Sequence, residues 1–396
     1  NRGSSGERAA GMVGLRVGHD SLSADERRVA NRSSIRCSCW LTATLAALWT
    51  SWGCAGERPP ENPPAHFDHT GILDGTLEGR DRIRDDRLGI PTDLILVGDN
   101  LVVSDAASED RLPVFWAHPG APRGSFGAKG EGPGEYKAAP FLFSSGESET
   151  SSFWTFEASR SRFVRYHLSP SGSAVDPIAA VPPPLRTERL MYEALLVDDT
   201  TWVGLGFLDS GRFARGVLNE AGFECVGPGL STRFDEDEVL LQQFHKAKLA
   251  SRPPEHDRLA LATIRGSSLE IFTSEGERIW MGAGPYPFDP DFVLDTRSGR
   301  SVWRAGPANR YGFVDVFGTA QCFYALFSGR SEEALRDEAW LAEFVYTFRW
   351  DGTLVRIHRL DRPALAIAVD ERRGEFLAVI FAPDPRVRAY SFAGGC

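Results

Sequence analysis

The sequence has 396 residues, with 42% hydrophobic and 11% aromatic residues, 40 glycines and 25 prolines. This apolar content is enough for a buried core and excludes wholesale disorder, and the many turn formers and aromatics favour strands over helices. The net charge is −10, and residues 1–53 carry seven Arg against four acidic residues, so residues 54–396 carry −13. Because a phosphate backbone needs a concentrated basic face, we expect no nucleic-acid partner.

The amino end has the pattern of an export signal. Four arginines between residues 27 and 36 precede an uncharged run over residues 37–55. That run is short for a bilayer span, and a basic stretch followed by a short apolar stretch is typical of a secretory signal. We therefore expect residues 1–53 to be a poorly structured leader that contains a signal peptide.

The signal ends in "SWGC", which resembles the lipobox of bacterial lipoproteins. Gly53 and Cys54 match that motif, whereas Ser51 and Trp52 depart from it. The resemblance implies lipidation of Cys54, followed by a Pro-rich tether over residues 54–65. The alternative is an ordinary cleaved signal with an incidental cysteine. No Asp retention signal follows the cysteine, so we expect an exported protein of the bacterial cell envelope, anchored by lipid to the outer membrane.

From residue 88 onward the chain repeats one module of about 50 residues, with two hairpins in each repeat. The turns of the second hairpins carry glycine, and Asp351-Gly352 is the strongest turn signal. The expected first hairpins span 93–105, 141–157, 194–206, 258–272, 314–328 and 364–380. A four-stranded sheet exposes both faces, and six such sheets bury them against one another when arranged radially. We therefore predict an all-β fold over residues 66–396, a six-bladed β-propeller with four-stranded antiparallel blades.

Three segments do not fit the repeat directly. Residues 66–79 are placed to close the ring by pairing with the last blade beside 386–392. Residues 231–249 have apolar side chains near helical spacing, and residues 328–344 resemble a short helix or a long loop. We expect the last two segments to be helical excursions from a blade or solvated loops.

The glycine-rich stretch "FGAKGEGPGEY" at residues 126–136 raises the question of a phosphate-binding loop. Such a loop lies between a strand and a helix, and no helix pattern or Lys-Ser/Thr pair follows here. Pro133 also removes a backbone donor. We interpret the stretch as a connection between the first two blades, with Glu135 accepting backbone hydrogen bonds.

The same stretch resembles a signature of the TolB-like six-bladed propeller lipoproteins. Residues 323–331, 344–379 and 387–392 are similar to the last two blades of that family. The resemblance covers residues 66–396 and implies a six-bladed propeller on a lipid anchor. The family has no generally established activity, so the resemblance assigns no catalytic, cofactor-binding or metal-binding residue.

Chemistry-bearing residues are scattered along the repeats. A lactonase-like cation site would need several carboxylate and amide oxygens meeting in the central funnel. The acidic and amide candidates are Asp93, Asp105, Asp198, Asp315, Asp370, Asn100, Asn219 and Asn309. Each aspartate also fits a turn at a strand end. The histidines, His66, His69, His118, His167, His245, His256 and His358, form no metal-binding motif.

Most tryptophans are expected in the core between blades, namely Trp202, Trp280, Trp303 and Trp350. Trp340 is the one that we expect to contact a partner. Removal of the leader and lipidation of Cys54 would leave Cys225, Cys322 and Cys396, and an oxidising envelope permits a Cys225–Cys322 disulfide.

These patterns favour a binding or scaffold module of the envelope over an enzyme. Its partner would be an envelope protein, a peptide or a glycan, and it would need no cofactor. The alternative is a hydrolase or lyase with a divalent cation in the funnel, similar to a sugar lactonase.

Overall fold

The computed structural model describes residues 65–66, 73–132, 134–144, 152–169, 179–181, 191–208, 210–218, 220, 222–230, 238–285, 287–295, 302–335, 338–381, 384–393 and 396. The predicted leader, Cys54 and nearly all of the predicted tether lie outside these residues. No helix within the described part is long and apolar enough to cross a membrane.

The first three blades are four-stranded antiparallel sheets whose strands follow chain order. Blade 1 contains β4 (Pro91–Val97), β5 (Asn100–Asp105), β6 (Asp110–Trp116) and β7 (Pro122–Ala128). Blade 2 contains β8 (Phe141–Ser144), β9 (Ser152–Glu157), β10 (Arg162–His167) and β11 (Ala179–Val181), with a 3₁₀ turn at Ala158–Arg160. Blade 3 contains β12 (Met191–Leu196), β13 (Thr201–Gly206), β14 (Phe213–Val217) and β15 (Glu224–Val226).

The last three blades each include a strand from the amino end of the chain. Blade 4 contains β16 (Ala247–Ser251), β17 (Arg258–Thr263), β18 (Ser268–Thr273), β19 (Arg278–Ala283) and β1 (Ala65–His66). Blade 5 contains β22 (Phe313–Gly318), β23 (Cys322–Phe327), β24 (Ala342–Arg349), β25 (Leu354–Ala364) and β2 (Leu73–Leu77). Blade 6 contains β26 (Ile367–Asp370), β27 (Glu375–Ile380), β28 (Arg386–Ser391) and β3 (Arg80–Ile83).

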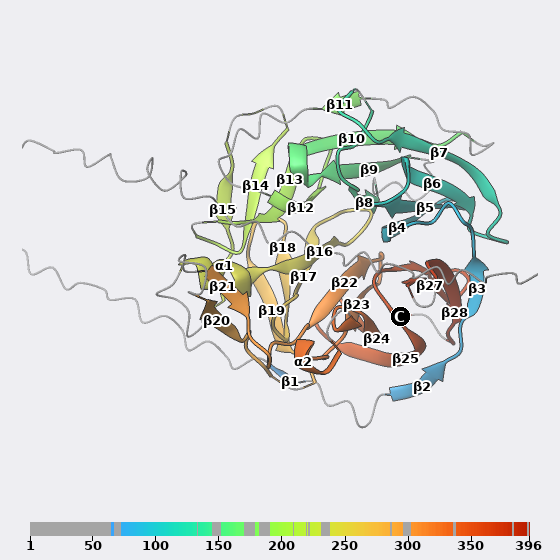
Figure 1. Ribbon diagram of the computed structural model, residues 1–396. Coiled ribbons are helices and arrows are strands. Elements are labelled where there is room, and N and C mark those ends of the chain that lie inside the picture. The colour runs from blue at the N-terminus through green and yellow to red at the C-terminus, as the bar shows by residue number, and fades with distance from the viewer. Residues whose placement is uncertain are drawn as a thin grey trace, which may run out of the picture. The chain divides into compact units, whose positions relative to one another are not determined.

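The six sheets close into a ring. The first strands of the blades contact one another in the cyclic order β4, β8, β12, β16, β22, β26 and back to β4. Five of them, β4, β8, β12, β16 and β22, are labelled in Figure 1 around the centre of the ring. Buried apolar side chains of the described residues form six clusters, one at each interface between neighbouring blades. This confirms the predicted six-bladed propeller, in which each sheet buries its faces against its neighbours.

In blade 4 the prediction of which strands form the first hairpin is wrong. Residues 258–272 form the second and third strands of blade 4, β17 and β18, because β16 precedes them. The sequence predicts a helical excursion or a solvated loop over residues 231–249. The described part of this segment contains the helix α1 (Glu238–His245), but Ala247–Leu249 already belong to β16.

The second expected excursion contains the one-turn helix α2 (Glu332–Leu335), which precedes β24. A two-stranded sheet, β20 (Phe292–Asp295) with β21 (Val302–Ala305), follows blade 4 in sequence. Its Val293 and Leu294 side chains are exposed.

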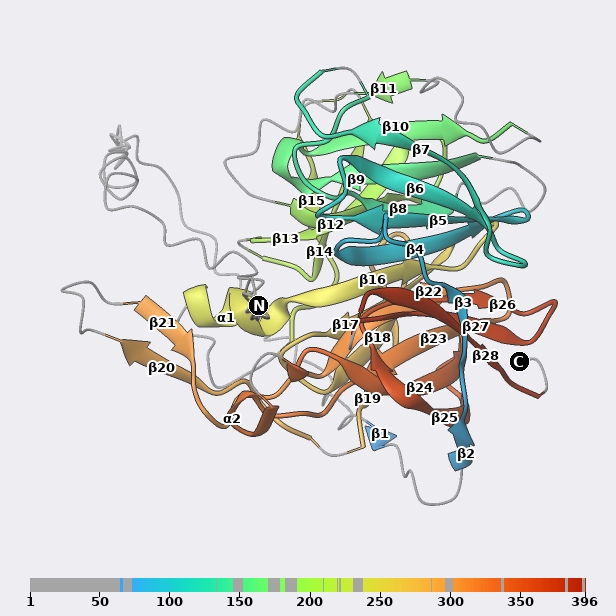
Figure 2. The same cartoon turned by 45° about the vertical axis from the view of Figure 1, so that its right-hand side comes forward.

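The amino-terminal segment adds strands to three blades and completes the last of them. β1 pairs parallel with β19 of blade 4, and β2 pairs parallel with β25 of blade 5. β3 then completes blade 6 by pairing antiparallel with β28, as Figure 2 shows. Closure by the amino end is therefore confirmed, but the closing strand lies just after the predicted 66–79. That segment protects the outer edges of blades 4 and 5.

The glycine-rich stretch connects blades 1 and 2, as predicted. Gly127 and Gly134 have positive φ values of 70° and 74°, which a residue with a Cβ rarely adopts. The Glu135 carboxylate accepts the Gly132 N–H at 2.7 Å. The ring of Tyr136 is fully buried against Gly127, and its hydroxyl lies 2.6 Å from Thr155 Oγ1 in blade 2. The stretch therefore fastens one blade to the next.

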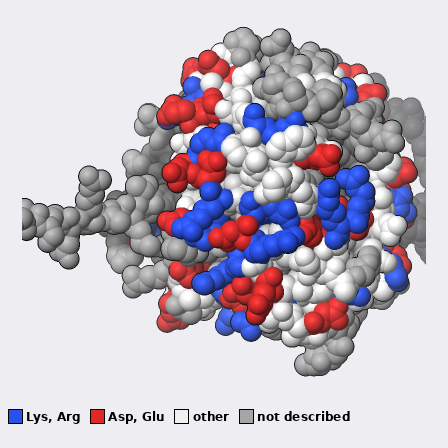
Figure 3. Space-filling model, turned by 90° about the vertical axis from the view of Figure 1, so that its right-hand side faces the viewer, with Lys and Arg blue, Asp and Glu red and all other residues white. Residues whose placement is uncertain are grey.

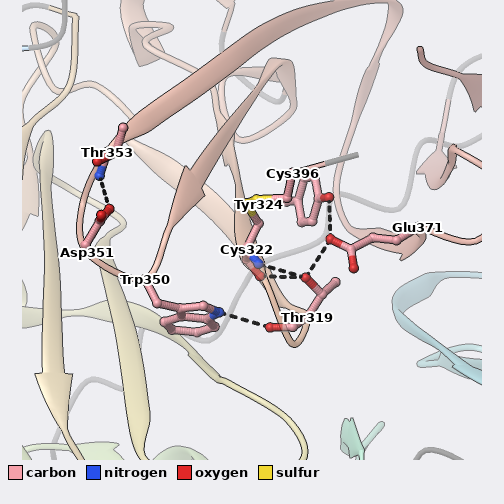
Figure 4. Close-up of a disulfide and its surroundings, with 8 residues drawn as sticks. All are labelled: Thr319, Cys322, Tyr324, Trp350, Asp351, Thr353, Glu371 and Cys396. Carbon is pink, nitrogen blue, oxygen red and sulfur yellow. Dashed lines mark hydrogen bonds between the residues drawn. A yellow bond between two sulfur atoms is a disulfide. The ribbon is translucent and has the colours of Figure 1, made fainter. Parts of the chain in front are cut away.

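The one disulfide among the described residues joins Cys322 in β23 to Cys396, whose Cα atoms are 6.0 Å apart (Figure 4). It fastens the carboxyl end to blade 5. The Cys225–Cys322 bridge that the sequence permits is not formed, because Cys322 is bonded to Cys396 and Cys225, in the last strand of blade 3, is free. Beside the disulfide, Tyr324 Oη donates to Glu371 Oε1 of blade 6 at 2.8 Å.

Figure 3 shows that basic and acidic side chains alternate on the side of the propeller that carries β3 and β28. Arg386 Nη1 lies 3.0 Å from Asp81, and Arg388 Nη1 lies 3.0 Å from Asp361. The arginines on this face are therefore paired with carboxylates, and the face is not uniformly positive.

Candidate functional site

A cavity of about 90 Å³ lies in the channel of the propeller, lined by residues from the first strand of every blade. Much of its wall is apolar, with Leu142, Leu195 and Val316 among the lining residues. Four charged side chains also line it, namely Asp93, Glu193, Lys248 and Asp315. A concave apolar pocket with a few convergent polar groups is the usual form of a ligand site.

The three acids occupy the same position in alternate blades. Asp93, Glu193 and Asp315 are each the third residue of the first strand of blades 1, 3 and 5. In each strand the pairing register shifts immediately before the acid. Such a bulge turns a side chain away from its regular direction. The shared irregularity places all three carboxylates in the channel.

Each carboxylate also bonds the backbone of the following blade. Asp93 Oδ2 accepts the Leu142 N–H at 2.8 Å, and Asp315 Oδ2 accepts the Ile367 N–H at 2.8 Å. Glu193 Oε1 accepts the Leu249 N–H at 2.7 Å. These N–H groups belong to the first strands of blades 2, 6 and 4. The acids therefore join the blades in pairs.

Lys248 of blade 4 lies among the three carboxylates. Its Nζ is 3.3 Å from Glu193 Oε2 and lies 5.0 Å from the centroid of the Phe141 ring. The Lys248 side chain is 21% exposed, and this exposed part faces the cavity. The ammonium is thus held by one ion pair and one aromatic face.

The protonation of the cluster follows from its enclosure. Burial, followed by the nearby charge of Asp315, raises the pKa of Asp93 to about 8. Burial also raises the pKa values of Asp315 and Glu193. Burial acts to lower the pKa of Lys248, but the three carboxylates outweigh it and the pKa is raised. At neutral pH, Lys248 is charged and Asp93 holds a proton.

A second polar pair, Ser251 and His256, lines the same cavity. Ser251 Oγ and His256 Nδ1 are 2.6 Å apart. His256 is 6% exposed and has a φ of 51°, and burial lowers the pKa of its imidazole. Its Nε2 makes no hydrogen bond to any described residue, so it is available to a molecule in the channel.

The predicted acidic candidates have different roles. Asp93 and Asp315 meet in the channel, whereas Asp105 accepts backbone N–H groups at the end of β5. Asp198 accepts the Thr200 and Thr201 N–H groups in a turn, and Asp370 pairs with Arg373. The turn interpretation is therefore confirmed for Asp105 and Asp198.

The two amide candidates within the described part, Asn100 and Asn309, do not line the cavity. Asn100 donates to the Val97 carbonyl in a hairpin turn, and Asn309 is fully buried outside the channel lining. Asn219 lies outside the described residues. The described part contains no group of three His, Cys, Asp or Glu side chains placed to hold a metal ion.

The aromatic and histidine candidates mostly pack within the blades. Trp202 and Trp350 are buried, as predicted, and Trp280 packs partly buried on the core. Trp340, the expected partner contact, is half-buried, and its ring centroid lies 5.4 Å from that of Phe381. Of the histidines whose side chains the structure describes, only His256 lines the cavity. The Trp303 and His66 side chains and all of His69 lie outside the described part.

A family model described as "TolB-like 6-blade propeller-like" matches residues 87–372. The chain belongs to the TolB-like six-bladed propeller family. This TolB-like propeller is similar to the crystal structure of a DUF4221 family member from Bacteroides vulgatus, with a TM-score of 0.50 and 9% identity, covering 80% of this chain and 98% of that one.

Two further solved structures show a more distant likeness to this TolB-like propeller. A putative exported protein from Bacteroides fragilis has a TM-score of 0.46 and 11% identity, over 81% of this chain and 98% of that one. Raptor from Chaetomium thermophilum has a TM-score of 0.45 and 12% identity. The match covers 81% of this chain but only 29% of the Raptor chain. No curated protein matches the sequence.

Proposed function

We propose that the protein is a lipid-anchored propeller of the bacterial cell envelope that binds an envelope protein, peptide or glycan. The observation that carries this proposal is the channel cavity, into which four blades direct charged side chains. No single strand could supply these four charged side chains, and the closed ring of blades holds them in place around the cavity. Pre-organised polar groups in an apolar cavity favour selective binding.

The hydrolase alternative has less support. A divalent cation in a protein takes six or more oxygen ligands as Ca²⁺, or near-octahedral oxygens as Mg²⁺. The described residues offer no group of three suitable side chains, and the Lys248 ammonium lies 3.3 Å from Glu193, one of the channel carboxylates. The Lys248 ammonium would therefore compete with a bound metal cation for the same carboxylate oxygens.

The anchor is tested at Cys54. In a bacterial host, metabolic labelling with an alkyne fatty acid is expected to label the wild type and to place it in the outer-membrane fraction. Cys54→Ser should lose the label and appear in the soluble fraction, because the acyl chains supply the membrane affinity. Cys225→Ser is the matched control and should behave as the wild type. A labelled Cys54→Ser protein, or an unlabelled wild type, would refute the anchor.

The binding site is tested by filling the channel. Ser144 is exposed and lines the cavity, so Ser144→Trp is expected to block the channel without disturbing the core. Arg84→Trp, at a side chain that is 68% exposed on blade 6, is the matched control. Peptide, glycan and protein fractions of an envelope extract are passed over each immobilised protein.

At least one component should bind to the wild type and to Arg84→Trp, and should be retained at least tenfold less by Ser144→Trp. Affinity constants measured on the purified component give the fold-change. Equal retention by both tryptophan variants would place binding outside the channel and contradict the proposal.

A further inference from the structure

The charges of the channel cluster do not balance. Three carboxylates, Asp93, Glu193 and Asp315, face one ammonium, that of Lys248. Glu193 is 3.3 Å from Lys248 Nζ and forms the closest ion pair. Asp93 and Asp315 accept backbone N–H groups, repel each other and share the attraction of the same Lys248 ammonium. When all three acids are ionised, the site would therefore stabilise one more positive charge, which is either a proton on Asp93 or a bound cation.

An independent feature at the same cavity points to a ligand. His256 is 6% exposed and lines the cavity, and its Nε2 makes no hydrogen bond to a described residue. Nε2 is not one of the fully buried atoms that lack a partner, so water or a ligand in the cavity can reach it. Ser251, 2.6 Å from Nδ1, holds the ring in place.

Between these polar groups the wall is apolar. Leu142, Leu195 and Val316 come from three different blades and line the cavity together. At about 90 Å³ the cavity holds several water molecules, each needing about 10–15 Å³. A short alkyl chain would displace water from this wall and gain roughly 0.8 kcal/mol for each buried methylene.

We propose that the channel cavity binds a primary ammonium group carried on a short alkyl chain. Asp93 and Asp315 accept hydrogen bonds from the ammonium, the aliphatic wall contacts the chain, and His256 bonds a polar atom beyond it. This inference rests on the proposed function, since it names the ligand chemistry of the same cavity. The ammonium comes either from a free amine or from a lysine side chain of a peptide.

Binding of an ammonium competes with the proton on the Asp93–Asp315 pair. The groups around Asp93 are Asp315 of β22, Lys248 of β16 and Glu193 of β12, whereas β8 and β26 contribute Leu142 and Ile367. Because the pKa of Asp93 is raised to about 8, one proton must leave when the ligand binds at lower pH. The affinity should therefore rise roughly tenfold per pH unit between pH 6 and 8.

Calorimetry on the full chain tests this with two amines. One arm uses n-propylammonium chloride, and the other uses acetyl-Gly-Lys-Gly-amide, which carries the same group on a peptide. We expect saturable binding in at least one arm, with the stated pH dependence. Neutral n-propanol and acetyl-Gly-norleucine-Gly-amide should bind at least tenfold more weakly. The stronger arm identifies the source of the ammonium.

Substitutions locate the site. Asp93→Asn and Asp315→Asn should each weaken amine binding at least tenfold at pH 8 and flatten its pH dependence. Asp198→Asn, in a surface turn, is the control and should bind as the wild type. If an Asn variant does not fold, the pH dependence and the neutral analogues measured on the wild type still decide the matter.

The inference is overturned if neither amine binds saturably between pH 6 and 9, if the neutral analogues bind equally well, or if both Asn variants bind as the wild type does. Its failure is distinguishable from that of the proposed function. An envelope ligand that Ser144→Trp blocks would still support the channel as a binding site. Amine binding without any retained envelope component would support the ligand chemistry alone.

Discussion

Replacing Arg212 with methionine is expected to lower the free energy of unfolding by about 3–5 kcal/mol. Arg212 precedes β14 of blade 3, and its Nε donates to Glu270 Oε2 of blade 4 at 2.5 Å. Neither side chain is exposed to solvent. Arg212 Nη1 also donates to the carbonyl of His245, the last residue of α1. The substitution leaves a carboxylate buried beside Arg278 alone and removes the link to the helix end.

Chemical unfolding of the wild type and of matched variants measures this effect. Arg215→Met is the control, because Arg215 and Glu224 form a pair whose side chains are 32% and 61% exposed. Exposed pairs contribute about 0–1 kcal/mol, so this variant should unfold close to the wild type. A loss below about 1 kcal/mol in Arg212→Met would contradict the role assigned to the buried pair.

The double variant Arg212→Met/Glu270→Leu separates the attraction between the two charges from the cost of burying one charge without its partner. It removes both charges and fills the space with apolar side chains, so it should be more stable than Arg212→Met alone. A double variant that is as unstable as the sum of the two single ones would mean that the charges do not interact.

The propeller could be predicted because its signals are local. Each hairpin needs only a strand, a polar turn with glycine and a second strand, and these recur at a spacing of about 50 residues. The first strand of blade 4, "AKLAS" at residues 247–251, could not be recognised because it closely follows α1 and continues the apolar spacing of that helix. The pairing of β1 with blade 4 and of β2 with blade 5 depends on how the ring closes. The sequence of the amino-terminal segment alone does not indicate these partners.

The candidate site was predictable only in part. The sequence marks Asp93 and Asp315 as acids near strand ends and His256 as a histidine outside any metal-binding motif, but it gives no sign that Glu193, Lys248 and Ser251 lie beside them. Aligning the first strands of blades 1, 3 and 5 would have placed Glu193 beside the two aspartates, since all three are third residues. The bulges that turn them inward and the position of Lys248 depend on contacts between blades.

Acid should destabilise the propeller through His358, a residue of β25 that is 2% exposed. Its ring packs against Phe376 and Phe392, and neither ring nitrogen has a hydrogen-bond partner among the described residues. Burial lowers the pKa of His358 from 6.5 to about 4; the charge of Asp74 acts to raise this pKa by a smaller amount, and that of Arg356 lowers it further. Below pH 6.5 the unfolded chain therefore takes up a proton that the folded protein refuses.

Above about pH 6.5, protonation of His358 should therefore not affect the free energy of unfolding. As the pH drops from 6.5 towards 4, protonation of His358 in the unfolded chain should lower that free energy. The difference between the two pKa values corresponds to about 3 kcal/mol, fully lost below pH 4. His358→Leu should remove this dependence, so its advantage over the wild type should grow by about 3 kcal/mol between pH 7 and 4. The free energies of unfolding of both proteins at each pH measure that difference.

His358→Gln is the matched control, because glutamine keeps a buried polar group but does not titrate. It should be less stable than His358→Leu at every pH, through its unsatisfied amide, and the stability difference between these two variants should stay constant from pH 7 to 4. A stability difference between wild type and His358→Leu that does not change with pH would mean that the folded protein accepts the proton at His358. The aromatic packing around the ring would then open to water at acid pH, because a charged imidazole cannot remain between Phe376 and Phe392 without solvent or a carboxylate.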